Sequence, residues 1–380
     1  MLPSFYQSCL QAQLSETQFV TLEVLVELLQ EERRITIERL ATLFPQPILF
    51  ESRRRNIQRF LRLPQLTPQA LWFPIIKQWI KRHFKHKQRL HLVIDRTQWQ
   101  DHNLIMVSVV YQHRAIPLHW VWLDKQGQSS LSEQQKVLRP VLRLLKKHCF
   151  VLLGDREFHS IELAAWCVEK RVNFVFRLPK STTVKTNDSN SFTRLDDLPQ
   201  TPGLTEQYLQ IQVTQKRGFG KHNLVLRQKR TYRQSNEDAW YLLTNLTDAA
   251  ETLKAYSHRF CIEPLFKDYK SGGYHLEDCQ ADLRRFTALL VLIAIAYSIS
   301  TLRGERIRKQ QVHHYIGRVT EPKRTTNRHS NFWIGLYGSL WIDAFRLWST
   351  LASKLMALKP QKRRFFERGL NAISLIHSAF

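Results

Sequence analysis

The sequence predicts an α/β protein: a ribonuclease H-like mixed sheet with a β-rich insertion, flanked by helical N- and C-terminal regions. Three observations predict it. Residues 89–123 contain three β-rich runs with short polar breaks, the pattern of an antiparallel meander. A helical stretch and then a strand–helix–strand unit follow, which is the element order of a ribonuclease H-like sheet. Helical periodicity dominates both ends of the 380-residue chain, which is long enough for two or three hydrophobic cores.

The charge of the chain predicts an anionic partner. The sequence has 57 Lys and Arg residues against 32 Asp and Glu residues, a formal net charge of +25. Such an excess repels itself in a compact state and is usually tolerated because a polyanion binds it. We therefore expect nucleic acid as the first candidate partner, with a membrane surface as the second and no membrane favoured. A membrane surface would require a basic amphipathic segment with a lipid-facing stripe, and no clear one is present.

Cysteine usage and the first residues argue against a secreted protein. The five cysteines are scattered and contain no CxxC pair, which disfavours both a disulfide framework and a zinc ribbon. Residues 1–16 lack the basic-then-apolar order of a signal peptide. We expect a protein of the reducing cytoplasm.

The N-terminal region, residues 1–88, is predicted to be helical and is a candidate for DNA binding. Two of its segments, residues 35–44 and 51–63, resemble two helices around a proline-containing turn. Three consecutive arginines crowd the second segment: Arg53, Arg54 and Arg55. This helix is expected to lie in a DNA groove or along phosphates, or else to be a basic helix that only faces solvent.

The rest of the chain divides by pattern. The expected segments after the N-terminal region are a first catalytic-core segment at 89–179, a β-rich insertion at 180–238, a second catalytic-core segment at 239–305 and a basic helical region at 306–380. The insertion is rich in Thr, Ser, Asn, Asp and Gln, and we expect it to leave the sheet, to which the chain returns at 239–246. The 17 apolar residues 286–302 reach the lower edge of a membrane span, but a buried core helix is the better interpretation.

Two acids stand where apolar strands are predicted to end. Asp95 closes the run 91–95 and Asp155 closes the run 150–155. Neighbouring strands would bring both carboxylates to one sheet edge, where Glu263, on a helix, is the third acid. Three carboxylates repel one another unless cations lie between them, and oxygen ligands suit Mg²⁺, with Mn²⁺ as a substitute. Taken singly, each aspartate is more often a cap or turn residue.

Four residues of different chemistry recur at helical spacing. Tyr256, Arg259, Glu263 and Lys270 are separated by 3, 4 and 7 positions. On one helix they would fall within a wedge of roughly 60°, a narrow polar face. The alternative is a solvated face with exposed charge pairs. Pro264 directly follows Glu263 and disfavours the α conformation there, so a bend is expected.

These residues carry a resemblance to a known family. The order Tyr256-x2-Arg259-x3-Glu263-x6-Lys270 resembles the YREK signature of bacterial insertion-sequence transposases of the DDE class. The segments "VIDRTQW" and "GDREF" resemble the regions around that family's first and second aspartates, and the resemblance spans residues 90–300 or so.

The resemblance implies roles for individual residues. Asp95, Asp155 and Glu263 would be the metal-binding catalytic triad, holding two Mg²⁺ ions. Tyr256, Arg259 and Lys270 would hold the phosphate next to the cleaved DNA end. Trp240 matches an aromatic that stacks an extruded base, with a core tryptophan as the alternative. Arg177 matches a DNA-contacting arginine, with a plain surface arginine as the alternative.

The resemblance also implies the function, and within it the binding of DNA ends by residues 1–88. We expect a DNA transposase that cleaves insertion-sequence ends and joins them to target DNA by two-metal phosphodiester hydrolysis and transesterification. It would act as a homodimer on the double-stranded DNA of transposon ends and target, in the bacterial cytoplasm and associated with the nucleoid. The alternatives are a structure-specific nuclease on the same core, and a decayed transposase that only binds DNA. Glu277, after the helix, is an acid we do not expect to be catalytic.

Overall fold

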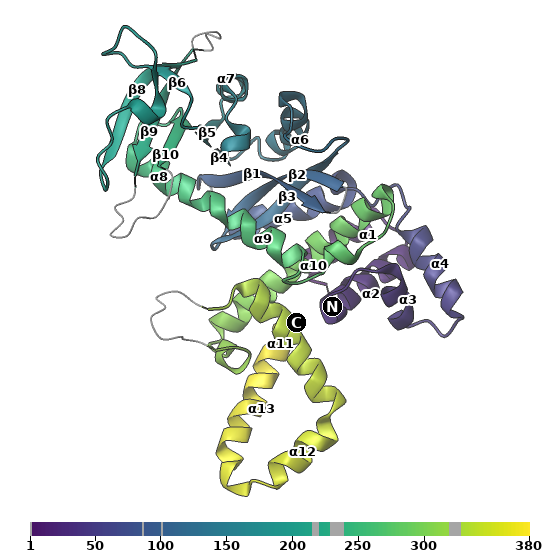
Figure 1. Cartoon of the computed structure of the whole chain (residues 1–380). Helices are drawn as coiled ribbons and strands as arrows, with labels where there is room; N and C mark the ends of the chain where they lie inside the picture. Colours follow the sequence, from purple (N-terminus) through teal and green to yellow (C-terminus); the bar gives the residue numbers. More distant parts are fainter. Residues whose placement is uncertain (1, 86, 100–101, 215–219, 229–238, 319–327) are drawn as a thin grey trace. The chain divides into compact units, whose positions relative to one another are not determined.

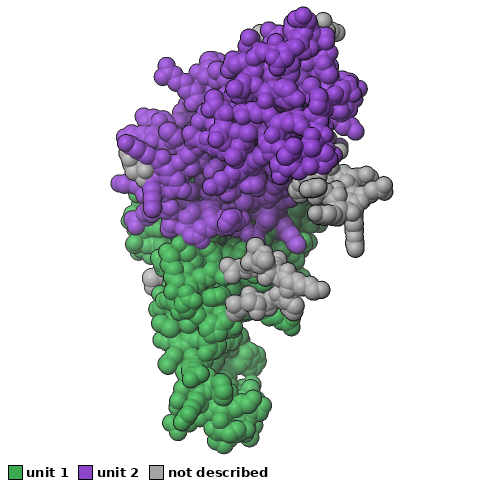
Figure 2. Space-filling model, turned by 90° about the vertical axis from the view of Figure 1, so that its left-hand side faces the viewer, with its two compact units in different colours: residues 1–78, 268–380 green, residues 79–267 purple. Residues whose placement is uncertain are grey.

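The computed structural model describes residues 2–85, 87–99, 102–214, 220–228, 239–318 and 328–380. The chain forms two compact units, coloured separately in Figure 2. Residues 79–267 form one unit, and residues 1–78 and 268–380 together form the other. Most of the predicted N-terminal helical region, up to residue 78, and the predicted C-terminal helical region thus belong to the same unit.

The unit of residues 79–267 contains a single sheet, with strands in the order β3-β2-β1-β4-β5-β10-β9-β8-β6-β7. Its strands are β1 (Leu90–Trp99), β2 (His102–Tyr111), β3 (Arg114–Leu123), β4 (Phe150–Gly154), β5 (Asn173–Arg177), β6 (Thr183–Lys185), β7 (Thr193–Arg194), β8 (Thr205–Val213), β9 (Lys221–Arg227) and β10 (Trp240–Thr244). The first three strands are antiparallel neighbours, whereas β4 lies parallel to β1 and β5 parallel to β4. This arrangement confirms the predicted ribonuclease H-like sheet.

The β-rich insertion extends this sheet, so the prediction that it leaves the sheet is wrong. β10 returns antiparallel to β5, as expected, and β9 pairs with the other edge of β10. The buried residues 224–226 of β9 give the physical reason, because they continue the apolar layer of β10. An unpaired β10 edge would also leave backbone donors and acceptors without partners.

Three helices of this unit pack on the sheet. They are α6 (Leu131–Leu144), α7 (Ile161–Glu169) and α8 (Ala249–Ser257). α6 packs over β2 and β3, α7 against β5, and α8 against β4, β5, β8 and β9. Figure 1 shows α6 and α7 on one side of the sheet and α8 on the other.

The single helix expected to carry Tyr256, Arg259 and Glu263 is interrupted. α8 ends at Ser257, a 3₁₀ turn covers His258–Cys261, and α9 (Ile262–Tyr269) begins afterwards. Pro264 supplies the reason, because proline fits the first turn of a helix but not its interior. The angles of a continuous helical wheel therefore do not apply here.

The other unit is helical, as predicted. Its helices are α1 (Ser4–Gln11), α2 (Glu16–Glu32), α3 (Ile37–Leu43), α4 (Phe50–Phe60), α10 (Leu283–Lys309), α11 (Asn331–Leu347), α12 (Ser349–Ala357) and α13 (Arg363–His377), while α5 (Phe73–His83) runs across the division between the units. The two helices predicted around a proline turn are α3 and α4, and they contact each other.

The long apolar run forms the core helix of this unit. In the described part of the chain, α10 is the one helix long and apolar enough to cross a membrane, and 89% of its apolar window is buried by the chain itself. It packs against α2 and α11. The approach to α11 is close: a Cβ atom on Gly335 would lie 1.8 Å from the Ser300 carbonyl oxygen. These contacts confirm the interpretation of residues 286–302 as a buried core helix.

Candidate active site

Asp95 and Asp155 lie next to each other where the parallel ladder between β1 and β4 ends. The last paired residues of that ladder are Ile94 and Gly154, and each is directly followed by one of the aspartates. Asp155 follows β4, as predicted. Asp95, however, lies inside β1, so its prediction as a strand end is wrong: β1 runs on to Trp99 because its other edge keeps pairing with β2.

A tight turn sets the position of Asp155. The Asp155 side chain caps the 3₁₀ turn Arg156–Phe158 that starts directly after it. Gly154 lets this turn fold back, because a Cβ atom there would lie 2.7 Å from the Cβ atom of Phe158. Asp155 is therefore a turn residue and a neighbour of Asp95 at once, so the two sequence interpretations do not exclude each other.

Backbone donors orient both carboxylates. The Arg96 N–H donates to Asp95 Oδ1 at 2.8 Å. The Glu157 N–H donates to Asp155 Oδ1 at 2.9 Å. Each aspartate is thus held by the backbone of a residue that follows it closely, and the Oδ2 oxygen is the one that Asp95 presents to its other neighbours.

The environment of Asp95 disfavours its charge. Burial raises the pKa of Asp95 to about 7, and the charges of Asp155 and Glu157 add to the rise, against the Arg96 N–H and the Arg259 guanidinium. Only 15% of the Asp95 side chain is exposed. Two crowded carboxylates, one of them largely buried, form a place where a divalent cation would relieve their repulsion.

Arg259 connects Asp95 to Glu263. Its Nη2 lies 2.7 Å from Glu263 Oε1, and its Nη1 lies 3.8 Å from Asp95 Oδ2. The arginine side chain is 11% exposed, whereas that of Glu263 is 56% exposed. The 3₁₀ turn between α8 and α9 carries Arg259, and its guanidinium lies between the two acids.

The donor set fits a divalent cation only in part. Adjacent aspartate oxygens are the hard ligands that Mg²⁺ prefers. Among the residues that the structure describes, however, no group of three or more His, Cys, Asp or Glu side chains is arranged to hold a metal ion. Asp95 and Asp155 are together, and Glu263 reaches Asp95 through Arg259. Glu263 would have to give up its contact with Arg259 to become a ligand.

Aromatic residues form a group beside these acids. The Trp240 ring lies 4.9 Å from that of Tyr256 at an angle of 75°, and 6.0 Å from that of Phe260 at 29°. Tyr256 is buried and Trp240 half-buried, whereas Phe260 is 38% exposed. The Arg259 guanidinium carbon lies 4.2 Å from the centre of the Phe260 ring.

No role is predicted for Phe260 from the sequence. Its position directly after Arg259 could have indicated one, but on a continuous helix its side chain would point away from the polar face. The 3₁₀ turn brings it into the same group as Arg259. Trp240 is neither a fully buried core residue nor an exposed one.

Arg177, at the end of β5, is not a plain surface arginine. Its side chain is hydrogen-bonded to the Tyr256 hydroxyl, and its Nη2 donates to the Ala239 carbonyl at 3.2 Å. Burial raises the pKa of Tyr256, and the charges of Arg259 and Arg177 oppose that rise. The Tyr256 hydroxyl therefore lies near the positive charges of both Arg177 and Arg259.

The remaining predicted site residues belong to the other unit. Lys270 Nζ lies 3.8 Å from Glu277 Oε1, so the acid that we expect not to be catalytic is its ion-pair partner. The Arg53 side chain donates to the carbonyls of Ala41 and Ile48, each at 2.8 Å. Arg53 thus holds the turn between α3 and α4.

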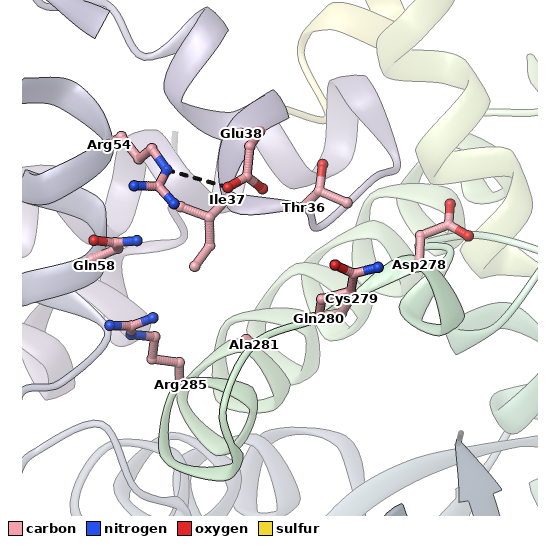
Figure 3. A pocket seen from close by; sticks show the side chains of 10 residues that line it. All are labelled: Thr36, Ile37, Glu38, Arg54, Gln58, Asp278, Cys279, Gln280, Ala281 and Arg285. Atoms are coloured by element: carbon pink, nitrogen blue, oxygen red, sulfur yellow. Dashed lines mark hydrogen bonds and ion pairs between the residues drawn. The ribbon is translucent and has the colours of Figure 1, made fainter. Parts of the chain in front are cut away.

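Arg54 and Arg55 differ in their surroundings. Arg54 Nε lies 3.2 Å from Glu38 Oε1, at the wall of a cavity of about 490 Å³ that Arg285 also lines (Figure 3). Arg55 is exposed. Of the three consecutive arginines, Arg55 is thus the one whose exposure suits a contact with a DNA backbone.

A family model and a solved structure are similar to this chain. A family model described as "Transposase DDE domain" matches residues 79–299, which is more than half of the chain and includes Asp95, Asp155 and Glu263. The cryo-EM structure of the piggyBac transposase synaptic complex with hairpin DNA is similar with a TM-score of 0.45 and 14% identity, over 99% of this chain and 81% of that chain. No curated protein matches the sequence.

The crowding of Asp95 predicts a pH-dependent stability. Its folded-state pKa of about 7 lies above that of an unfolded aspartate, so the stability that protonated Asp95 contributes is lost as the pH rises from about 4 through 7. We expect metal-free Asp95→Asn to melt above the wild type at pH 8, with a smaller difference at pH 5. Mg²⁺ should raise the melting temperature of the wild type at pH 8 more than that of the variant. If the melting temperatures of the two proteins change with pH in parallel, the raised pKa of Asp95 is contradicted.

Proposed function

Because the chain belongs to the transposase DDE-domain family, it is a DNA transposase, and we propose that Asp95, Asp155 and Glu263 are its catalytic carboxylates. They would serve the cleavage of insertion-sequence ends and the joining of these ends to target DNA. The single observation that supports this assignment best is the pair of aspartates at the end of the β1–β4 ladder. Arg259, which contacts both Asp95 and Glu263, links the third acid to that pair.

Enzymes of this family use divalent metal ions, and we propose two Mg²⁺ ions here, with Mn²⁺ as a substitute. Asp95 and Asp155 would hold them together, with Glu263 joining once it leaves Arg259. When bound, such ions activate a water or a 3′-hydroxyl and stabilise the leaving oxygen of the phosphodiester.

The cationic residues would hold the DNA. Arg259 has a planar fork of donors that suits a phosphate, so a guanidinium released from Glu263 could bind the phosphate next to the cleaved bond. We propose that Tyr256 holds the same phosphate and that Arg177, which is hydrogen-bonded to Tyr256, contacts the DNA beside it. We assign Lys270 to the same phosphate and Arg55 to the DNA backbone. The net charge of +25 supports transposon ends and target DNA as partners, and an association with the nucleoid in the cytoplasm.

Trp240 would stack a base extruded from the transposon end. Its ring is half-buried and packs against the rings of Phe260 and Tyr256. These contacts hold the Trp240 ring in place before DNA binds. Extrusion loses base stacking, which an aromatic ring recovers at about 1–3 kcal/mol per base.

A second copy of the chain is proposed as a further partner. Leu351 and Leu355 on α12 and Leu358, the residue that follows its last turn, are 51%, 64% and 76% exposed, and no residue of this helix is buried. A helix this short is marginal without tertiary contacts. We propose that these leucines pack against the partner in a homodimer.

The proposed homodimer predicts an effect of Leu355→Glu, which places a charge among these leucines. The variant should lower the mass of the protein–DNA complex in light scattering. An unchanged mass would argue against an interface at α12.

The assignment of the triad predicts a separation of cleavage from binding. Asp95→Ala, Asp155→Ala and Glu263→Ala should each abolish strand cleavage, because each removes a metal ligand. DNA affinity should stay within about threefold, since it comes mostly from phosphate contacts. Gel assays of nicking and strand joining on a labelled transposon end measure both.

Glu277→Ala is the control for this experiment and should keep most activity. An inactive Glu277→Ala beside an active Glu263→Ala would show that the third acid is assigned wrongly. A wild-type protein that nicks the end but never joins it would favour the nuclease alternative, and one that binds without nicking would favour a decayed enzyme.

The role of Trp240 predicts a step-specific defect. Trp240→Ala should leave the first nick nearly intact and slow the later steps that need the extruded base by about tenfold or more. Trp240→Phe should recover some of the lost rate, because a smaller ring still stacks. Timed gels beside thermal melts distinguish this from a core role, which predicts a lower melting temperature and an equal loss at every step.

A further inference from the structure

Two charged residues outside the predicted site connect the segments that carry the aspartates. Arg96 directly follows Asp95, and Glu157 comes two positions after Asp155. Arg96 Nε lies 2.7 Å from Glu157 Oε2, and the two side chains are 23% and 10% exposed. This ion pair thus joins β1 to the turn after β4, at the end of the ladder where the two aspartates lie.

The same two residues supply the backbone donors of the site. The Arg96 N–H binds Asp95 and the Glu157 N–H binds Asp155. Because the side chain and the backbone of a residue are covalently connected, the ion pair restrains the distance between these two N–H groups. It therefore restrains how far apart the two carboxylates lie and which oxygens they present.

Further hydrogen bonds hold the ion pair from outside. Glu157 Oε1 accepts from the Ser129 N–H at 2.9 Å and from its hydroxyl at 2.8 Å. Arg96 Nη1 donates to Asn103 Oδ1 at 3.1 Å, and the buried Asn103 donates to the carbonyls of Lys125 and Gly127. The loop between β3 and α6 thereby fixes both members of the pair.

The energetics favour a positioning role over a stabilising one. Largely buried ion pairs seldom stabilise a fold more than apolar residues of similar size would, because both charges lose their hydration. This pair also adds the negative charge of Glu157 to a neighbourhood that already disfavours charge on Asp95. The pair instead fixes the geometry of the two aspartates. Groups that hydrogen-bond to metal ligands have the same effect in known metalloenzymes.

We propose that Arg96 and Glu157 are positioning residues that hold Asp95 and Asp155 in one orientation and thereby set the affinity of the site for divalent cations. Neither side chain is assigned as a metal ligand. The proposal rests on the proposed function of the two aspartates as metal ligands.

The test compares three variants of the full chain. Glu157→Gln keeps the size and one acceptor oxygen but removes the charge, and Arg96→Met keeps an apolar stem. Each should raise the Mg²⁺ concentration for half-maximal cleavage by about tenfold or more, with a rate at saturating Mg²⁺ near that of the wild type. Mn²⁺ binding, followed by electron paramagnetic resonance without DNA, should weaken to the same extent. The double variant should be no worse than the poorer single variant, because both changes break one contact.

A matched control and a conservative variant complete the test. Glu251→Gln breaks another Arg–Glu pair of the same unit, that with Arg89, which contacts neither aspartate, and should leave the Mg²⁺ dependence unchanged. Arg96→Lys keeps the charge but has no planar fork, and should give an intermediate shift. If Glu157→Gln does not fold, Arg96→Met and Arg96→Lys still test the pair.

Two outcomes would overturn the proposal. One is a lower melting temperature together with a lower rate at every Mg²⁺ concentration and an unchanged half-saturation, which is the result of a merely structural pair. The other is additive losses in the double variant. If Asp95→Ala binds Mn²⁺ as the wild type does, the proposed function itself is wrong. If Asp95→Ala loses Mn²⁺ while Glu157→Gln binds it normally, only the positioning role is wrong.

Discussion

The candidate site depends on the crowding of two carboxylates at the end of one parallel ladder. Ile94 pairs with Gly154, so Asp95 in β1 and Asp155 directly after β4 are the next residues along the two chain segments and lie close together. Burial and the charge of Asp155 then raise the pKa of Asp95 to about 7. Backbone donors, the Arg96–Glu157 pair and Arg259 are all arranged around this repulsion, and a divalent cation is the ligand that would relieve it.

Arg259 is the cation next to the acids of the site. The 3₁₀ turn between α8 and α9 carries it, and its guanidinium lies near Asp95, Glu263 and the Phe260 ring. Arg259 therefore balances the charge of the acids in the structure and is the group proposed to hold a DNA phosphate. If Glu263 moved from Arg259 to a metal ion when DNA binds, the three carboxylates would come together only in the presence of DNA.

Much of this could be predicted from the sequence, because it depends on local pattern. Apolar runs that end in Asp95 and Asp155 predict two acids at one sheet edge, and the spacing of Tyr256, Arg259 and Glu263 marks a polar functional segment. The 3₁₀ turn could not be read from helical periodicity, although Pro264 indicated a bend. Residue alternation identified the insertion strands but not their partner, since pairing with β10 is a long-range choice. The Arg96–Glu157 contact likewise follows from the register of β1 and β4, which no local pattern contains.

The most direct measurement is the location of Mn²⁺ by anomalous diffraction in crystals of the protein with a transposon-end duplex. We predict Mn²⁺ bound by carboxylate oxygens of both Asp95 and Asp155, with Glu263 completing the site and Arg259 moved from Glu263 to a DNA phosphate. Mn²⁺ bound without Asp95 or Asp155, or a Glu263 that stays on Arg259 while DNA is cleaved in the same crystals, would contradict this prediction.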